Sequence, residues 1–399
     1  MKGREVYILS YARTPIGSFQ GILKSLSAPM LGALAIEGAI KKVNFPKKYI
    51  EEVIMGNVLS AGLGQAPARQ SAIYANLAKS VDCLTINKMC GSGLKSIMIA
   101  AQSISSGEID VAIAGGMESM SNAPHYLFKA REGYRLGHKQ IIDGIIQDGL
   151  WDVYNDKHMG TCAEMCAERY SFSRKEQDAY AAESYRRAIS AIESGFFENE
   201  IVPVEVPQRK EKSKTIRIDE EPYRAKLDKF SKLSPVFQRN GTVTAANASS
   251  INDGAAACLL ISGEKASSLG LSPIFKINSF CSLSQEPEWF TTAPIGAMKK
   301  LFKKTNLKQK DIDLYEINEA FSVVPMAAMK DLSLDHKKVN VNGGAVSIGH
   351  PIGSSGTRII ITLMNSMMAK NYNTGMASIC IGGGEASAMI LEKIGNKTF

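Results

Sequence analysis

Apolar and polar residues alternate with two different periods along this chain. Short runs rich in Val, Ile and Leu predict strands, and longer runs with apolar residues three and four apart predict helices. Strands are predicted at 6–10, 53–59, 84–87, 111–114, 274–280, 314–317, 339–341 and 377–381. Helices are predicted at 30–42, 94–105, 295–303, 323–329 and 354–369. This alternation is typical of a sheet with helices on its faces.

The two halves of the chain resemble each other in sequence as well as in pattern. Residues 110–119 (DVAIAGGMES) resemble 376–387 (MASICIGGGEAS). In the second half a returning strand at 388–391 follows at once, whereas its counterpart in the first half, 255–261, arrives about 135 residues later. We therefore expect an α/β fold in which two similar βαβαβ-type halves pack as a layered core, with an inserted loop domain. The predicted boundaries are 1–119 plus 251–270 for the N-terminal half, 120–250 for the insert and 271–399 for the C-terminal half.

The predicted insert holds one strong helix and the densest basic patch. The helix begins at a capping box, Ser173 with Glu176, and ends at Gly195. The patch is interrupted by Glu211, which favours a solvated loop or hairpin. Its basic members are Arg209, Lys210, Lys212, Lys214 and Arg217. An insert beside a reactive group usually shapes the path of the substrate.

Composition narrows the class of protein. With 399 residues, 45% apolar and 22% charged, the chain is typical of a globular protein of two or three domains. No uncharged run approaches the ~18 residues that cross a bilayer. The first apolar run is too short for a signal peptide, so we expect a cytoplasmic protein with no membrane partner. The net charge of +8 is not gathered into an arm or stripe, which favours a phosphorylated small molecule over nucleic acid.

The seven cysteines are an odd number and are scattered through apolar segments. This usage predicts reduced thiols inside a cell. Cys162 and Cys166 form a close pair on one face of a helix-like segment. They lack further ligands at suitable spacing, so we expect no zinc site there.

Cys90 lies in the segment Asn87–Gly93, between a strand-like and a helix-like run. The N-terminus of a helix favours an anion, so this position predicts a thiolate and hence a nucleophile. Gly91 and Gly93 would let a substrate carbonyl approach the backbone donors beside the sulfur. The alternative is a buried cysteine that fills a strand-to-helix corner.

Three further stretches lie where the repeat brings strand ends together. His350 stands in a glycine-rich turn before a helix, and histidine is the natural base for a thiol. Cys380 ends a strand just before the glycines at 382–384, whose N–H groups are open to a ligand. Asn318 follows one strand and precedes a helix. Taken alone, each of these residues also fits a structural role.

Taken together, Asn87–Gly93, Asn318–Phe321, Gly343–Gly353 and Cys380–Gly384 resemble the motifs of the thiolases in order and spacing, and Ala12–Gly17 adds support. Within that family the chain is similar to the biosynthetic acetyl-CoA acetyltransferases, over nearly its whole length. The resemblance implies a transferase that reversibly condenses two acetyl-CoA to acetoacetyl-CoA and CoA. It also implies a homo-oligomer, a dimer or a tetramer.

The resemblance assigns roles to the candidate residues. Cys90, deprotonated by His350, takes an acetyl group from the first acetyl-CoA. Cys380 then removes an α-proton from the second, whose carbanion attacks the acyl-enzyme. The enolate is stabilised by His350 and by a water on Asn318, and the acyl-enzyme oxygen by the backbone N–H groups of Cys90 and Gly382.

The resemblance also places the substrate coenzyme A on the insert, with no tightly bound cofactor. The positions that match substrate or CoA contacts are Leu150, His158, Met159, Tyr185, Lys229, Ser249 and Phe321. The positions that resemble the potassium site of one subgroup are Tyr185, Ala245, Ala246, Ala248 and Val346. That subgroup has proline after the residue that corresponds to Phe290, whereas this chain has Thr291.

Three other functions stay open at the level of sequence. One is a degradative 3-ketoacyl-CoA thiolase of broader chain length. Another is a Cys-His thioester hydrolase, which needs a third group to orient the histidine and leaves Cys380 without a role. The third is a non-catalytic acyl-CoA-binding relative. Trp289, Phe290 and Met159 are expected to line a short acyl pocket, which favours acetyl units. An acetyl-CoA acetyltransferase could serve fatty acid, mevalonate or ketone metabolism.

Overall fold

The computed structural model describes residues 3–208 and 212–394. Within them, one ten-stranded sheet runs through the molecule in the order β14-β15-β16-β13-β1-β12-β5-β3-β4, with β2 beside β12. The strands are β1 (Val6–Arg13), β2 (Gly17–Ser18), β3 (Glu52–Gly56), β4 (Asp82–Ile86), β5 (Val111–Ser119), β12 (Asn252–Ser262), β13 (Phe275–Ser284), β14 (Leu314–Ile317), β15 (Thr374–Ile381) and β16 (Glu385–Lys393). In each half the strand that comes last in sequence, β12 or β16, lies between the first strand, β1 or β13, and the remaining strands.

The two halves use the same strand order. In the N-terminal half β12 is antiparallel to β1 and to β5, and β3 is parallel to β5 and β4. In the C-terminal half β16 is likewise antiparallel to β13 and β15, and β14 is parallel to β15. The halves join where β1 and β13 pair, with Tyr7 opposite Lys276. The likeness seen between 110–119 and 376–387 thus extends to the whole sheet.

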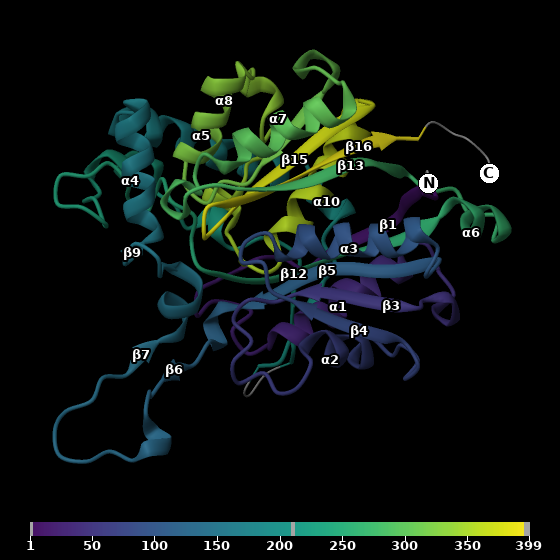
Figure 1. The fold of residues 1–399 in the computed structure, drawn as a ribbon, viewed down its shortest axis with the longest axis horizontal. Helices are drawn as coiled ribbons and strands as arrows, with labels where there is room; N and C mark the ends of the chain where they lie inside the picture. Colours follow the sequence, from purple (N-terminus) through teal and green to yellow (C-terminus); the bar gives the residue numbers. More distant parts are fainter. Residues whose placement is uncertain (1–2, 209–211, 395–399) are drawn as a thin grey trace.

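Helices cover the outer faces of both halves and fill the space between them (Figure 1). Helices α1 (Ala28–Lys41) and α2 (Pro67–Tyr74) pack on the N-terminal strands, and α7 (Ala293–Thr305), joined by α8 (Val323–Leu332), packs on the C-terminal strands. Helices α3 (Ser92–Ser106) and α10 (Ser355–Lys370) pack together in the middle layer.

The sheet is buried on both faces. Along β1, Val6 and Ile8 belong to the middle core with α3 and α10, whereas Tyr7 and Leu9 belong to the outer core with α1. Both sets of side chains are therefore apolar, which explains why the strands read as continuous rather than alternating apolar runs.

The segment between β5 and β12 carries its own short elements. Helices α4 (Met159–Tyr170) and α5 (Arg174–Glu193) lie beside the C-terminal half, and α5 begins with the predicted capping box of Ser173 and Glu176. Three two-stranded sheets pair β6 (His125–Tyr126) with β7 (Ile142–Asp143), β8 (Trp151–Asp152) with β9 (Lys157–His158), and β10 (Val204–Val206) with β11 (Lys214–Ile216). The loop of the β6–β7 hairpin projects away from the body (Figure 1). The β10–β11 hairpin carries part of the basic patch, of which Arg209 and Lys210 lie outside the described residues.

The predicted strand at 339–341 is wrong. These residues make only isolated bridges, one of them between Val339 and Tyr315. Asn340 has a φ of 48°, in the left-handed region that interrupts an extended strand. Its side chain replaces the missing strand, because Oδ1 accepts the N–H of Ile317 at 2.8 Å and Nδ2 donates to the Ile317 carbonyl at 2.8 Å. The Asn340 side chain thus takes up backbone hydrogen bonds at the outer edge of β14. In the N-terminal half the corresponding edge, that of β3, is covered by β4.

No helix in residues 3–208 or 212–394 combines the length and the apolar character needed to cross a membrane.

Candidate active site

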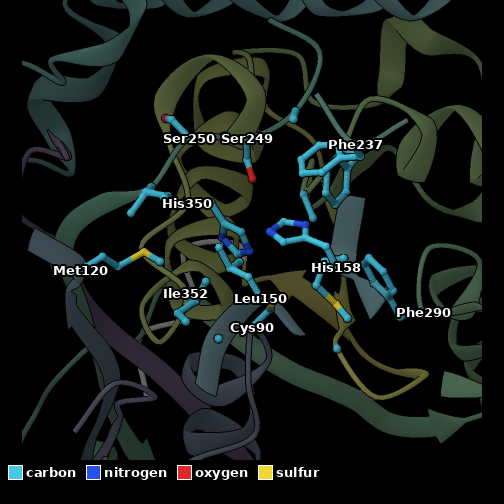
Figure 2. Close-up of a pocket in the computed structure, with 17 residues that line it drawn as sticks. Cys90, Met120, Leu150, His158, Phe237, Ser249, Ser250, Phe290, His350 and Ile352 are labelled. Atoms are coloured by element: carbon cyan, nitrogen blue, oxygen red, sulfur yellow. The ribbon is translucent and has the colours of Figure 1, made fainter. Parts of the chain in front are cut away.

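The motif turns of both halves meet around a cavity of about 260 Å³ (Figure 2). Cys90 and His350 both line it, and so does Gly382. The cavity is also lined by five of the predicted substrate or CoA positions: Leu150, His158, Met159, Ser249 and Phe321. Most of the other lining residues are apolar, so the cavity suits a small uncharged group.

Cys90 sits in the tight turn between β4 and α3. Ser92 closes this turn, since its Oγ accepts the N–H of Lys88 at 2.8 Å and donates to the Met89 carbonyl at 2.7 Å. A Cβ added at Gly91 would lie 2.3 Å from Cδ1 of Ile381, in the other half of the molecule. The glycine therefore lets the two halves approach closely at this turn, and access of a carbonyl to the backbone donors stays a prediction.

Burial of Cys90 opposes the thiolate form that the helix N-terminus favours. Burial raises the pKa of Cys90 to about 11, even though the N–H groups of Gly382 and of Cys90 itself point at the sulfur and lower it. Desolvation of the thiolate thus outweighs the helix N-terminus. Cys90 needs a base at the moment when it reacts.

His350 lies in the turn between α9 (Ala345–Ile348) and α10, and a strand of the other half holds it. Asn252 of β12 accepts the backbone N–H of His350 at 2.8 Å. Gly349 has a φ of 108° and packs against the Asn252 side chain, so this turn requires glycine. Burial, reinforced by the charge of Arg358, lowers the pKa of His350 to about 3. The imidazole is therefore neutral and able to accept a proton.

Glu118 on β5 ties the turns of both halves together, a role that the motifs did not reveal. Its carboxylate accepts the N–H groups of Val58 and Leu59 and, from the C-terminal half, of Gly353, at 2.9 to 3.1 Å. Burial raises the pKa of Glu118 to about 7, although these donors oppose the shift.

Cys380 and Asn318 lie behind the lining rather than in it, and both are fully buried. The Cys380 thiol receives the N–H of Ala320, but burial and the nearby Cys90 raise the pKa of Cys380 well above its usual value. Asn318 is anchored through its backbone N–H, which donates to the Ser378 carbonyl at 2.9 Å. Neither polar atom of its side chain has a hydrogen bond partner within the described residues. Asn318 therefore has a donor and an acceptor to offer.

His158 presents a defined donor to the cavity. Its Nδ1 accepts the N–H of Gly160 at 3.0 Å, and its ring stacks on Phe237 with centroids 4.7 Å apart (Figure 2). Burial lowers the pKa of His158, so the ring is neutral. Its proton is then on Nε2. No sequence pattern pointed to Phe237.

Some predicted positions lie elsewhere. Tyr185 is buried against Phe230, with ring centroids 5.5 Å apart, and Lys229 is exposed on the surface beside it. Phe290 and Met159 line the cavity as expected. Trp289 does not, because its ring packs under the guanidinium of Arg169 at 4.6 Å.

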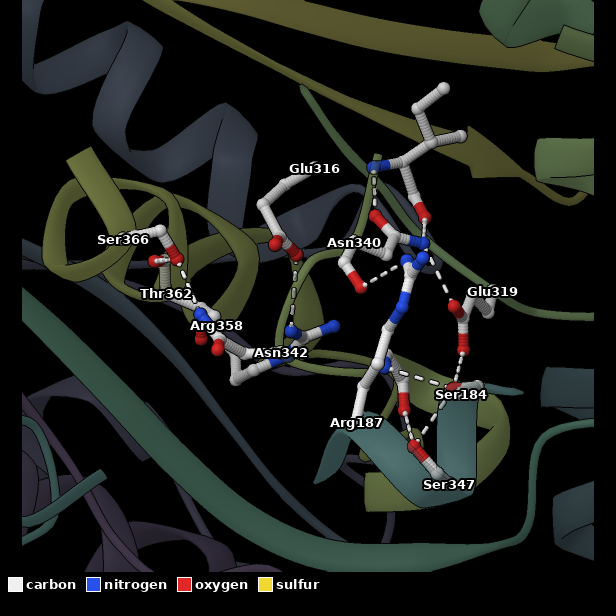
Figure 3. Close-up of polar contacts among 12 residues, drawn as sticks. Ser184, Arg187, Glu316, Glu319, Asn340, Asn342, Ser347, Arg358, Thr362 and Ser366 are labelled. Atoms are coloured by element: carbon white, nitrogen blue, oxygen red, sulfur yellow. Dashed lines mark hydrogen bonds and ion pairs between the residues drawn. The ribbon is translucent and has the colours of Figure 1, made fainter. Parts of the chain in front are cut away.

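Glu319 links helix α5 of the insert to the site (Figure 3). Its carboxylate accepts the hydroxyls of Tyr180 and Ser184 from α5, at 2.8 and 2.7 Å. It also accepts the N–H of Val346 on α9 at 3.1 Å. Because Asn318 is its neighbour in sequence and α9 leads into the turn that carries His350, Glu319 holds both of these turns to α5.

Comparison with known proteins gives one family. Residues 6–264 match the family described as "Thiolase, N-terminal domain" and residues 271–393 match "Thiolase, C-terminal domain". The chain is 54% identical over 392 residues to acetyl-CoA acetyltransferase 2 of Arabidopsis thaliana, covering 98% of this chain and 97% of the relative. It is 50% identical over 391 residues to the mitochondrial acetyl-CoA acetyltransferase of Bos taurus, covering 98% and 92%. The crystal structure of Acat5 thiolase from Ascaris suum in complex with coenzyme A superimposes with a TM-score of 0.93 at 47% identity, covering 98% of this chain and 100% of that one.

Proposed function

Because this chain belongs to the thiolase family, we propose that it is an acetyl-CoA C-acetyltransferase that reversibly condenses two acetyl-CoA to acetoacetyl-CoA and CoA. The observation that carries the proposal is the cavity where the Cys90 thiol and the neutral His350 meet, with the Cys380 thiol directly behind. A nucleophile, a base and a second thiol are what a two-step carbon–carbon bond formation through a thioester requires.

In the first step the Cys90 sulfur attacks the thioester carbonyl of acetyl-CoA while its proton passes to His350. The N–H groups of Cys90 and Gly382 already point at the sulfur, so they stand ready to stabilise the oxyanion that forms beside it. Collapse of the tetrahedral intermediate expels CoA as a thiolate and leaves the acetyl group on Cys90.

In the second step Cys380 acts as the base at carbon. Its thiol is neutral at rest, so it must first lose its proton, and the departing CoA thiolate is a base that forms close by. The Cys380 thiolate then removes an α-proton from a second acetyl-CoA, and the enolate is stabilised by the protonated His350 and by Asn318. The enolate attacks the acetyl group, and Cys90 leaves and recovers its proton from His350. All three groups return to their resting protonation states.

We propose that coenzyme A runs from the cavity over the insert. Leu150, His158, Met159 and Ser249 would contact the pantetheine arm, and Phe321 would contact the substrate, which the position of these residues in the lining supports. Lys229 is exposed and suits the phosphates of the nucleotide end. Tyr185 would influence the bound coenzyme A only through Phe230, against which its ring packs.

Two finer assignments stay predictions. The first is the potassium site. Tyr185, Ala246 and Val346 pack in one cluster, which fits a site built from a hydroxyl and backbone carbonyls. Thr291, however, stands where the potassium-activated subgroup has proline. A cytoplasmic compartment is the second, and the odd number of scattered thiols supports it only as far as a reducing environment. The bovine relative is named as mitochondrial.

We also propose the division into two halves and an insert with the predicted boundaries. The end of β5 at Ser119 and the start of β12 at Asn252 support it. The segment between these strands makes no strand of the main sheet in its described part.

Chain-length dependence of thiolysis tests the proposed activity. We expect acetoacetyl-CoA to be cleaved by CoA with a kcat/KM at least about tenfold above that of 3-ketohexanoyl-CoA, because Phe290 and Met159 close the cavity and one or two excluded methylenes are worth ~1–3 kcal/mol each. Steady-state assays with both thioesters measure this ratio. Equal or faster cleavage of the longer substrate would favour a degradative thiolase instead. Release of free acetate without acyl transfer would favour the hydrolase.

We expect the protein to be a dimer or tetramer. Strand β4 lies at the edge of the main sheet with Leu84 41% exposed, and the β6–β7 loop exposes Phe128 and Leu136. An apolar edge of this kind is usually covered by another chain. Light scattering at micromolar concentration measures the mass, and Leu84→Lys is expected to lower it. A monomer would contradict this proposal.

A further inference from the structure

The ring of His350 makes one hydrogen bond within the described residues. Its Nδ1 lies 2.5 Å from Oγ of Ser355, in the first turn of α10. Its other nitrogen, Nε2, is buried without a partner in that part of the chain. His350 lines the cavity together with Cys90 (Figure 2). Which of the two nitrogens carries the proton decides whether His350 can act as a base toward the thiol.

The second contact of Ser355 decides the direction of this hydrogen bond. Its Oγ also lies 3.0 Å from the carbonyl oxygen of Pro351. A carbonyl oxygen only accepts, so the single hydroxyl proton of Ser355 belongs between these two oxygens; otherwise two lone pairs would face each other. The Ser355 oxygen then has only lone pairs to offer to His350. Nδ1 must be the donor.

Resting on the acyl transfer proposed above, we infer that Ser355 is a positioning residue that keeps the proton of neutral His350 on Nδ1 and leaves the lone pair of Nε2 for the Cys90 thiol. As the sulfur–carbon bond forms, the Cys90 proton moves to Nε2 and the ring becomes an imidazolium. Ser355 accepts from Nδ1–H in both states, so no group has to turn during the transfer. The same proton returns to Cys90 when the acetyl group leaves.

The neighbouring residue provides a matched control. Ser354 is also buried, at 2% exposure. Ser354→Ala removes the same atom one position away from the His350 contact. Ser355→Thr keeps a hydroxyl at the contact itself.

The tautomer can be read without turnover. The full-length enzyme, labelled with histidine carrying ¹⁵N only at Nδ1, is examined by solid-state NMR, and the His350→Gln variant identifies the His350 signal among the five histidines. We expect the Nδ1 of His350 to resonate as a protonated nitrogen in the wild type and in Ser354→Ala. In Ser355→Ala the signal should move toward the unprotonated position, and Ser355→Thr should restore it.

Acetylation kinetics complete the test. Ser355→Ala is expected to slow acetylation of Cys90 by acetyl-CoA by roughly 10²- to 10⁴-fold, the range of general acid–base catalysis, while Ser354→Ala keeps the wild-type rate. An unprotonated Nδ1 in the wild type, or one that does not respond to Ser355→Ala, would overturn the inference. If Ser355→Ala does not fold, the wild-type signal still decides. Absence of acetylation in the wild type would instead count against the proposed function, since the NMR reading needs no substrate.

Discussion

Replacing Cys380 by serine is expected to abolish condensation while leaving acetylation of Cys90 largely intact. A serine hydroxyl is far too weak an acid to shuttle the α-proton near neutral pH, and general acid–base catalysis is typically worth ~10²–10⁴-fold. Acetylation needs only His350 and the backbone donors. The CoA thiolate is a stable leaving group, since an ordinary thiol has a pKa of about 8.5, so it can leave without an acid.

Rapid-quench acetylation by radiolabelled acetyl-CoA, measured beside steady-state turnover, tests this division of labour. Cys281→Ser is the matched control, because Cys281 is also a buried strand cysteine but lies outside the cavity lining. It should retain both activities. If acetylation of Cys380→Ser fell as steeply as its turnover, the two thiols would not have separate roles.

Replacing Cys90 by serine is expected to stop both steps, with a loss of turnover on the order of 10⁴-fold or more, as is usual when a nucleophile is removed. A serine hydroxyl is less acidic than a thiol. The same base, His350, therefore takes the proton of a serine hydroxyl far less readily than that of a thiol. The expectation follows from the acidity of the nucleophile as well as from the family.

Peptide mass spectrometry after incubation with acetyl-CoA locates the acyl group. In the wild type and in Cys380→Ser the acetyl group should be on Cys90, and in Cys90→Ser no acetyl-enzyme should accumulate. An acetyl group found only on Cys380 would reverse the assigned roles.

The sequence predicted most strands and helices but placed several ends too early. Strand β1 continues to Arg13 and β5 to Glu118 and Ser119, where the apolar pattern has already stopped. These polar residues are buried because distant residues satisfy them. The Arg13 guanidinium, for instance, forms ion pairs with Glu200 and Asp219 at 2.7 Å. A pattern read along the chain contains no information about partners nearly two hundred residues away.

The residues of the site likewise divide into those that a local sequence pattern reveals and those whose role depends on distant contacts. Cys90, His350 and Gly382 were found because each stands in or beside a glycine-rich turn that resembles a thiolase motif, and the structure gathers all three in one cavity. Asn252 and Ser355 were missed, because their roles depend on a single contact with His350 rather than on any local pattern. The effect of burial on the Cys90 thiol was also missed, because a local pattern does not show how deeply a side chain is buried.

The strand order has a consequence for how this protein folds in a cell. Strand β1 lies between β12 and β13, and both of these strands follow residue 250. At ~5–20 residues per second, the ribosome needs roughly 10–50 seconds to deliver them after β1 has emerged. During that time an apolar strand has both of its edges unpaired, and pairings of such long range also form slowly. The first strand made is therefore among the last to be paired, and while it waits it is a stretch of the nascent chain that a chaperone could protect.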